Sequence, residues 1–222
     1  MKIEHINTYG WNDALRGMRN PLNSWNRGDS SFKYDSENGS IKEFQIGPND
    51  EKLIKALTHG GSPHRKFLRS ITVSMDITAP TYWWAEMDTY KVGTTRNSCS
   101  LQHKGDSRDF TVDDFTFENL DTLSTVDYTE MLNDQETIIN IINKWRNKYI
   151  NGEKTDYNLF RVMRQFIPMS YNYKATWTAN YEILLNIYFW RKNHKLIEWR
   201  NFCSEILKKC PYFEKLVEFC GN

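Results

Sequence analysis

The sequence predicts a mixed fold, with strands in the first half of the chain and a mostly helical second half. Residues 67–78, FLRSITVSMDIT, alternate apolar with polar side chains and contain β-branched residues, which is typical of a strand. Residues 128–150 carry apolar side chains at helical spacing, and the helix that they predict closes at Asn151-Gly152. A chain of 222 residues is long enough for one large domain or two small ones.

Turn residues divide the rest of the first half. The elements expected there are a strand at 3–10, a helix at 13–19, a loop at 29–40, a strand at 41–46 and a helix from Pro48 that stops at 59–63. The first of these helices ends because Pro21 pushes Asn20 out of the helical region.

The remaining elements follow Ala79-Pro80, where the clear strand ends. They are a helix at 81–91, a polar loop at 93–109, further helices at about 155–166, 175–192 and 194–208, and a short helix after Pro211. Polar loops on a rigid scaffold often carry binding sites, so the loop at 93–109 is a candidate.

The charges nearly cancel, because 29 Lys and Arg residues stand against 28 Asp and Glu residues and leave a formal net charge of +1. This balance excludes the general phosphate attraction of a strongly basic nucleic-acid binder, so no nucleic-acid partner is expected. No apolar run approaches the ~20 residues of a membrane span, and the first residues show no signal peptide. We therefore expect a soluble, cytoplasmic protein without a membrane partner.

Aromatic residues are unusually frequent. The 8 Trp, 12 Tyr and 12 Phe residues exceed what a small core needs. Some of these rings are candidates to line a pocket for a flat ligand.

The cysteines and histidines do not form a metal-binding pattern. None of the four cysteines belongs to a C-x-x-C pair, and Cys203, Cys210 and Cys220 occupy helix-like positions. This favours buried free thiols over a disulfide framework or a zinc site. The histidines lack the close paired spacing of zinc ligands, so no metal ligand is assigned.

Three segments carry cations that suit an anionic ligand, and each also has a plain structural interpretation. The loop 91–104 combines cations with hydroxyl groups, and it is either a phosphate site or a solvated loop. The basic turn 59–66 has the same two interpretations. Arg16 and Arg19 lie three residues apart on one helix face, and they either grip a phosphate or pair with nearby acids.

In the second half, Lys174 and Arg191 lie in aromatic segments, where a cation needs an anionic partner. Glu182 is a candidate partner for Arg191. The chain contains no G-x-S-x-G, Walker or G-x-G-x-x-G motif, which argues against classical hydrolases, nucleoside triphosphatases and Rossmann folds.

Several segments, in the same order along the chain, resemble the flavin-dependent thymidylate synthases, the ThyX-type enzymes. Residues 167–180, IPMSYNYKATWTAN, resemble the family's proline-ended helix, its basic position at Lys174 and its Trp-Thr-x-Asn. Without a gap, Arg191 then falls on the arginine that contacts the nucleotide in the family. The other similar segments are an alanine-arginine segment at 14–19, a His-Gly turn at 57–64, a strand end at Ala79-Pro80 and a cysteine-proline at Cys210-Pro211.

The family signature Arg-His-Arg-x-x-Ser-x-Asn-Glu-x-Ser-x-Arg is partly present. The corresponding stretch is 89–102, TYKVGTTRNSCSLQ, with one inserted residue. Matching positions fall at Lys91, Thr94 or Thr95, Asn97 and Ser100. The first arginine, the histidine, the glutamate and the last arginine are replaced by Thr89, Tyr90, Ser98 and Gln102. These replacements remove charge that would bind phosphates.

The resemblance implies a single ThyX-like domain over residues 1–222, of the α+β class, with a central, mostly antiparallel sheet flanked by helices and a helical C-terminal half. It also implies a homotetramer that binds FAD and a pyrimidine deoxynucleotide monophosphate. The implied reaction is reductive methylation of dUMP at C5, with methylenetetrahydrofolate as carbon donor and NADPH as reductant. No protein nucleophile is assigned.

Carried over position by position, the resemblance implies two sets of site residues. The nucleotide would be held by Glu86, Ser100, Gln102, Lys174 and Arg191. The flavin would lie along Ser62, His64, Arg65, Tyr90, Lys91, Asn97 and Asn180. The structural alternatives are a helix-surface amide for Asn180 and a core ring for Tyr90.

Two other functions stay open. Altered signature residues around the base are what a changed substrate demands, so one alternative is hydroxymethylation of dUMP or action on dCMP with the same flavin. The other is a non-catalytic homologue that keeps the fold and binds a nucleotide without redox chemistry.

Overall fold

The computed structural model describes residues 1–37, 39, 41–117 and 122–221. Its contacts divide the chain into two compact units. Unit 1 consists of Met1, Thr78–Met87 and Ser98–Ala175, and unit 2 consists of Lys2–Ile77, Asp88–Asn97 and Thr176–Asn222. The single domain expected over the whole chain stays a prediction.

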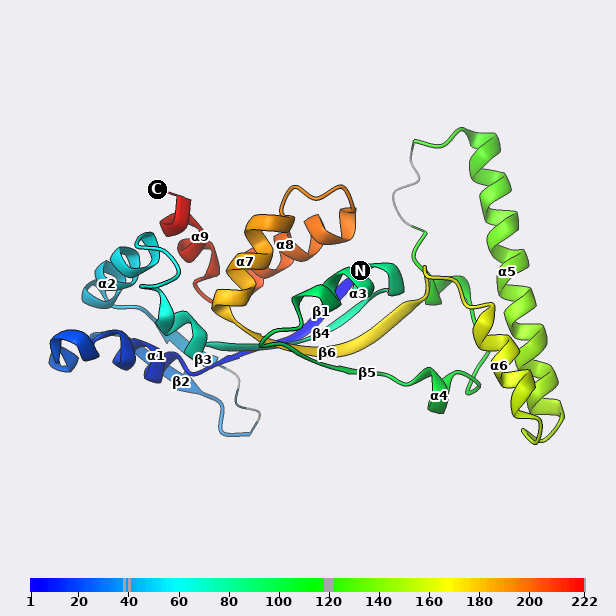
Figure 1. The fold of residues 1–222 in the computed structure, drawn as a ribbon, viewed down its shortest axis with the longest axis horizontal. Coiled ribbons are helices and arrows are strands. Elements are labelled where there is room, and N and C mark those ends of the chain that lie inside the picture. Colours follow the sequence, from blue (N-terminus) through cyan, green and yellow to red (C-terminus); the bar gives the residue numbers. More distant parts are fainter. Residues whose placement is uncertain (38, 40, 118–121, 222) are drawn as a thin grey trace. The chain divides into compact units, whose positions relative to one another are not determined.

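The main sheet has four antiparallel strands (Figure 1). Their order in the sheet is β1 (Lys2–Tyr9), β4 (Thr72–Pro80), β6 (Asn172–Asn180) and β5 (Thr95–Ser98). A second, two-stranded sheet pairs β2 (Ser31–Tyr34) with β3 (Ile41–Gln45), also antiparallel. Helices flank the main sheet, so the α+β class with a mostly antiparallel sheet is confirmed.

Helices make up much of both units. Unit 2 holds α1 (Trp11–Met18), α2 (Pro48–His59), α7 (Tyr181–Arg191), α8 (Ile197–Lys209), α9 (Phe213–Gly221) and four short 3₁₀ helices, η1 (Asn20–Leu22), η2 (Trp25–Arg27), η3 (Lys66–Ser70) and η4 (Asp88–Tyr90). Unit 1 holds α3 (Thr81–Met87), α4 (Leu101–Lys104), η5 (Val112–Asp114), α5 (Thr125–Asn151) and α6 (Tyr157–Gln165). Within the described residues, no helix is both long and apolar enough to cross a membrane.

Aromatic rings form much of the core of unit 2. Trp11 and Tyr181 are fully buried, and their ring centroids lie 5.2 Å apart, edge to face. Tyr181 also packs edge to face against Phe213 at 5.8 Å. Such pairs add to the hydrophobic effect, so these rings of the aromatic-rich sequence stabilise the fold rather than line a pocket.

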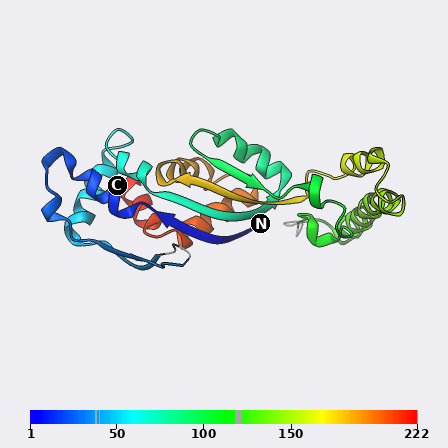
Figure 2. The ribbon, with the colours of Figure 1, turned by 90° about the horizontal axis from the view of Figure 1, so that it is seen from below.

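Unit 1 has its own core beneath the long helix. Helices α5 and α6 lie side by side (Figure 2). The buried residues of this cluster are Phe110, Phe115, Ile142, Phe160 and Met163. The apolar side of the helix predicted at 128–150 therefore packs against other apolar residues, as an amphipathic helix requires.

The prediction of a helix at 175–192 is wrong for its first part, because residues up to Asn180 form β6. Buried Ala175, Trp177 and Ala179 alternate with more exposed neighbours, which is the two-residue period of a strand. Helix α7 begins only at the next residue after β6.

The loops expected at 29–40 and 93–109 are also partly wrong. The first contains β2, and the second contains β5 and α4. All side chains of β5 are exposed, so no apolar alternation marks this strand in the sequence. Backbone pairing defines it instead, and just beyond it the Cys99 amide donates to the Lys174 carbonyl at 2.8 Å.

The clear strand starts later than expected. Residues Lys66–Ser70 form η3, and β4 begins at Thr72. Phe67 and Leu68 are adjacent and both buried, which a strand with one buried face does not allow. The remaining expected elements are present, with ends shifted by a few residues.

The cysteines predict a pattern of chemical labelling. Burial raises the pKa of Cys203 and of Cys210 to about 12, whereas Cys99 is exposed. The reactive thiolate form of the two buried residues is therefore scarce at pH 8. We expect a small alkylating reagent to label Cys99 first and Cys203 and Cys210 only after denaturation, as followed by peptide mass spectrometry. Early labelling of either buried thiol in the native protein would contradict this.

Candidate functional site

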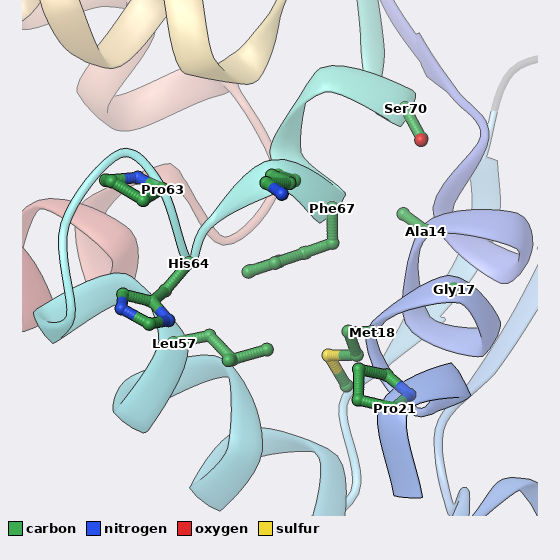
Figure 3. Close-up of a pocket in the computed structure, with 10 residues that line it drawn as sticks. Ala14, Gly17, Met18, Pro21, Leu57, Pro63, His64, Phe67 and Ser70 are labelled. Atoms are coloured by element: carbon green, nitrogen blue, oxygen red, sulfur yellow. The ribbon is translucent and has the colours of Figure 1, made fainter. Parts of the chain in front are cut away.

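An apolar pocket of about 410 Å³ lies in unit 2, between α1 and the turn that follows α2 (Figure 3). His64 and Leu57 stand on one side of it, and Met18 and Pro21 stand on the other. Lys66 and Ser70 add polar atoms to its lining. Of the residues expected to contact the flavin, His64 lines this pocket.

The neighbouring residues Ser62 and Arg65 bond to the start of α7. Ser62 Oγ donates to Glu182 Oε1, and Arg65 Nε donates to Glu182 Oε2, both at 2.8 Å. Arg65 Nη1 also donates to Cys220 Sγ at 3.3 Å. Both side chains of the Arg65–Glu182 ion pair are mostly buried, so the pair holds the turn against α7. Glu182, a candidate partner for Arg191 in the sequence, thus pairs with Arg65.

Asn180 is the N-cap of α7. Its Oδ1 atom accepts a hydrogen bond from the Ile183 amide at 3.0 Å, which satisfies one of the free N–H groups at the helix start. Asn180 is therefore a cap rather than the helix-surface amide of the structural alternative. A flavin-binding role for this residue stays a prediction.

Substitution of Asn180 tests how much the capping bond stabilises the fold. We expect Asn180→Ala to lower the free energy of unfolding by about 0.5–2 kcal/mol, because the capping bond is lost. Asn180→Ser is expected to keep most of the stability, since serine also caps helices. Urea unfolding measures both. Equal stability of the alanine variant and the native protein would show that the cap contributes nothing.

Arg191, at the end of α7, is held by aromatic side chains. Its Nε donates to the Tyr90 hydroxyl at 2.8 Å. The guanidinium carbon lies 4.5 Å from the Trp199 ring centroid and 5.4 Å from that of Tyr90. Nη1 is 2.9 Å from His194 Nε2. Hydrogen bonds and cation–π contacts thus fix a half-buried guanidinium before any ligand arrives.

The turn after Tyr90 runs along α7. Thr94 Oγ1 donates to the Tyr90 carbonyl at 2.9 Å. At Gly93, with φ of +73°, a Cβ atom would stand 2.9 Å from Ile183 Cδ1, so the turn lies close to the first part of α7. Lys91 belongs to this turn and is exposed. Unit 2 therefore brings Tyr90 and Arg191 together, and Lys91 follows Tyr90 directly in the chain. Asn97 is exposed in β5.

In unit 1, Gln102 is contacted by α6. Its Oε1 atom accepts hydrogen bonds from the Tyr157 hydroxyl at 3.0 Å and from Arg164 Nη1 at 2.9 Å. Ser100 precedes α4, and its carbonyl accepts the amide of Lys104 at 3.0 Å. A guanidinium therefore stands next to Gln102, where the family signature ends in arginine.

Lys174 and Glu86 belong to neighbouring elements of unit 1. The Cys99–Lys174 backbone bond places Lys174 beside the residue that precedes Ser100. Trp84 of α3 donates from Nε1 to the carbonyl of Tyr173 at 3.1 Å, so α3, which carries Glu86, packs beside β6.

The sequence matches no family model and no curated protein. Solved structures match it over the whole chain. The flavin-dependent thymidylate synthase ThyX from Helicobacter pylori, complexed with FAD and dUMP, is 14% identical, with a TM-score of 0.66 over 99% of both chains. A second structure of Helicobacter pylori ThyX, with FAD and dUMP, is 13% identical, with a TM-score of 0.65 over 100% of both chains. The chain has the fold of a flavin-dependent thymidylate synthase.

Within this thymidylate synthase fold, two further candidate site residues, Tyr157 and Arg164, are not predicted from the sequence. Tyr157 and Arg164 are seven residues apart on α6, which places them on one helix face, and both reach Gln102. The spacing was a usable signal in the sequence. The sequence gives no signal that Gln102 lies opposite that face, because 62 positions separate Gln102 from Arg164.

Proposed function

We propose that the protein is an FAD-dependent enzyme that reductively methylates dUMP at C5, with methylenetetrahydrofolate as carbon donor and NADPH as reductant. The observation that supports this most is the fold match over the whole chain to an enzyme solved with FAD and dUMP. A cytoplasmic homotetramer belongs to the same proposal.

The pocket beside His64 fits the ring part of FAD. Its volume of about 410 Å³ lies within the ~300–1,000 Å³ of pockets for such ligands. Met18, Leu57 and Phe67 offer apolar walls for a flat ring. His64 and Lys66 bring hydrogen-bonding groups that suit a ring carbonyl or a phosphate oxygen. When bound, FAD supplies the hydride chemistry of the reaction.

Each unit has residues of its own that suit the binding and orientation of a nucleotide. In unit 1, Arg164 and Gln102 present a guanidinium and an amide that suit phosphate and carbonyl oxygens. In unit 2, Arg191 offers a guanidinium whose orientation is already fixed, which reduces the entropy lost on binding. Precise placement of the substrate accounts for much of the rate in such reactions.

Exposed apolar side chains on and before α5 support the homotetramer. Leu123, Val126, Leu132 and Ile138 are 39%, 75%, 42% and 38% exposed. Contact with another copy of the chain would remove the apolar area of these side chains from water. Light scattering tests the proposal, since four times the 26.4 kDa chain mass is expected.

The first experiment is the visible absorption spectrum of the purified protein, before and after incubation with FAD and gel filtration. We expect flavin absorption bands in a stoichiometric amount. Release of tritium from dUMP labelled at C5 then tests substitution at that carbon, with labelled dCMP as the parallel substrate. Tritium release from dCMP alone would favour the changed substrate. A protein that binds dUMP but never retains FAD would overturn the enzyme proposal in favour of a nucleotide-binding homologue.

A further inference from the structure

Arg16 of α1 and Arg19, the residue that caps the C-terminus of this helix, have different partners. Arg19 is 5% exposed, and its Nε donates to Asp50 Oδ1 at 2.8 Å. The other carboxylate oxygen, Asp50 Oδ2, accepts the amides of Asp29 and Ser30 and the Ser30 hydroxyl at 3.1, 3.0 and 2.7 Å. Burial alone would raise the pKa of Asp50, but these bonds and Arg19 lower it below its ordinary value. The buried pair is therefore ionised on both sides and carries no net charge.

Arg16, one helical turn earlier, packs against an aromatic ring instead of a carboxylate. Its guanidinium carbon lies 5.1 Å from the Trp25 ring centroid. Among the residues that the structure describes, no carboxylate stands within ion-pair distance of Arg16. Trp25 is 42% exposed, and its Nε1 donates to Asn20 Oδ1 at 2.8 Å, which fixes the indole in place. A cation and a ring are thus held together at the surface.

A pocket of about 210 Å³ opens between these arginines, and we call it the Arg16 pocket. Its lining includes Leu15, Arg16, Trp25, Gly28 and Phe32, together with both members of the buried Arg19–Asp50 ion pair. At Gly28, a Cβ atom would stand 3.3 Å from the Trp25 carbonyl oxygen and 3.8 Å from Arg19 Nε. The glycine therefore lets the backbone pass close to the Trp25 carbonyl and the buried ion pair, where a side chain would be crowded.

We propose that the Arg16 pocket binds a small organic anion with a flat ring and a carboxylate. The Arg16 guanidinium matches a carboxylate in a two-bond geometry, and the Asp50 carboxylate of the same lining is bound to Arg19 rather than to Arg16. Leu15, Trp25 and Phe32 provide apolar contacts for the ring. Because its volume is below the ~300 Å³ of pockets for drug-sized ligands, the pocket takes a ligand with a single ring. This site is separate from the residues of the proposed enzyme function.

Equilibrium dialysis of the full-length protein with radiolabelled benzoate tests the proposal. We expect saturable binding of one benzoate per chain. Unlabelled benzoate should compete better than cyclohexanecarboxylate, which lacks the aromatic ring, and better than inorganic phosphate. Absence of saturable binding, or equal competition by all three anions, would overturn the proposal.

Three variants locate the site. Arg16→Gln removes the free charge and is expected to weaken benzoate binding at least tenfold. Gly28→Ala adds a Cβ atom 3.3 Å from the Trp25 carbonyl oxygen, at a φ of −66° and ψ of 131° that alanine adopts, and this crowding of the Trp25 wall should also weaken binding. Arg27→Gln changes an exposed arginine of the same segment outside the lining and should leave binding unchanged. Thermal unfolding confirms that each variant is folded. Equal affinity of the Arg16→Gln variant and the native protein would refute the site.

Discussion

Asp50→Ala is expected to lower the free energy of unfolding by about 3–5 kcal/mol, the usual cost of removing one partner of a buried ion pair. The loss leaves the Arg19 guanidinium buried without its carboxylate. It also leaves the amides of Asp29 and Ser30 without their acceptor. Urea unfolding monitored by circular dichroism measures the change.

The surface pair of Lys33 and Glu43 provides the matched control. Both side chains are more than half exposed, so Glu43→Ala should cost no more than about 1 kcal/mol. The pKa of Asp50 is lowered, so its contribution is complete above the ordinary carboxyl pKa of ~3.9 and is lost as pH falls through the lowered value. The Asp50→Ala variant should lack this part of the acid sensitivity. If Asp50→Ala and Glu43→Ala lowered the free energy of unfolding by similar amounts, burial would not explain the contribution of the Arg19–Asp50 pair to stability.

Arg191→Lys is expected to weaken dUMP binding ~10–100-fold, because a hydrogen bond to a charged group contributes about 1.5–3 kcal/mol. Lysine keeps the charge, but it loses the planar fork and the fixed position between the Tyr90 and Trp199 rings. Titration calorimetry with dUMP measures the affinity. Thermal unfolding shows whether the variant is folded.

Arg200→Lys is the control for Arg191→Lys. Arg200 is exposed, and its Nη1 donates to the backbone carbonyls of His194 and Lys195 at 2.6 and 2.9 Å. We expect its replacement to leave the dUMP affinity unchanged. If Arg191→Lys binds dUMP as tightly as the native protein, the nucleotide is held by other residues.

Elements with a strong local pattern were predictable from the sequence. The long helix α5 has apolar residues at helical spacing, and α2 starts at Pro48, a residue that is favoured in the first turn. The sequence predicts helix for residues 175–180, which form the end of β6, and loop for β5. In β5 every side chain is exposed, so the partner strand rather than the residues' own polarity makes it a strand.

The sequence by itself determined the resemblance to the thymidylate synthase family and the residue types of the candidate site, because motif spacing and turn chemistry are local properties. Only the tertiary structure decided which charges meet. Arg65 pairs with Glu182 across 117 positions of the chain, and Arg164 reaches Gln102 across 62. It also decided that Arg19 forms an ion pair with Asp50, whereas Arg16 packs against the Trp25 ring. Charges act over a few ångströms in space, so their partners depend on how distant segments pack.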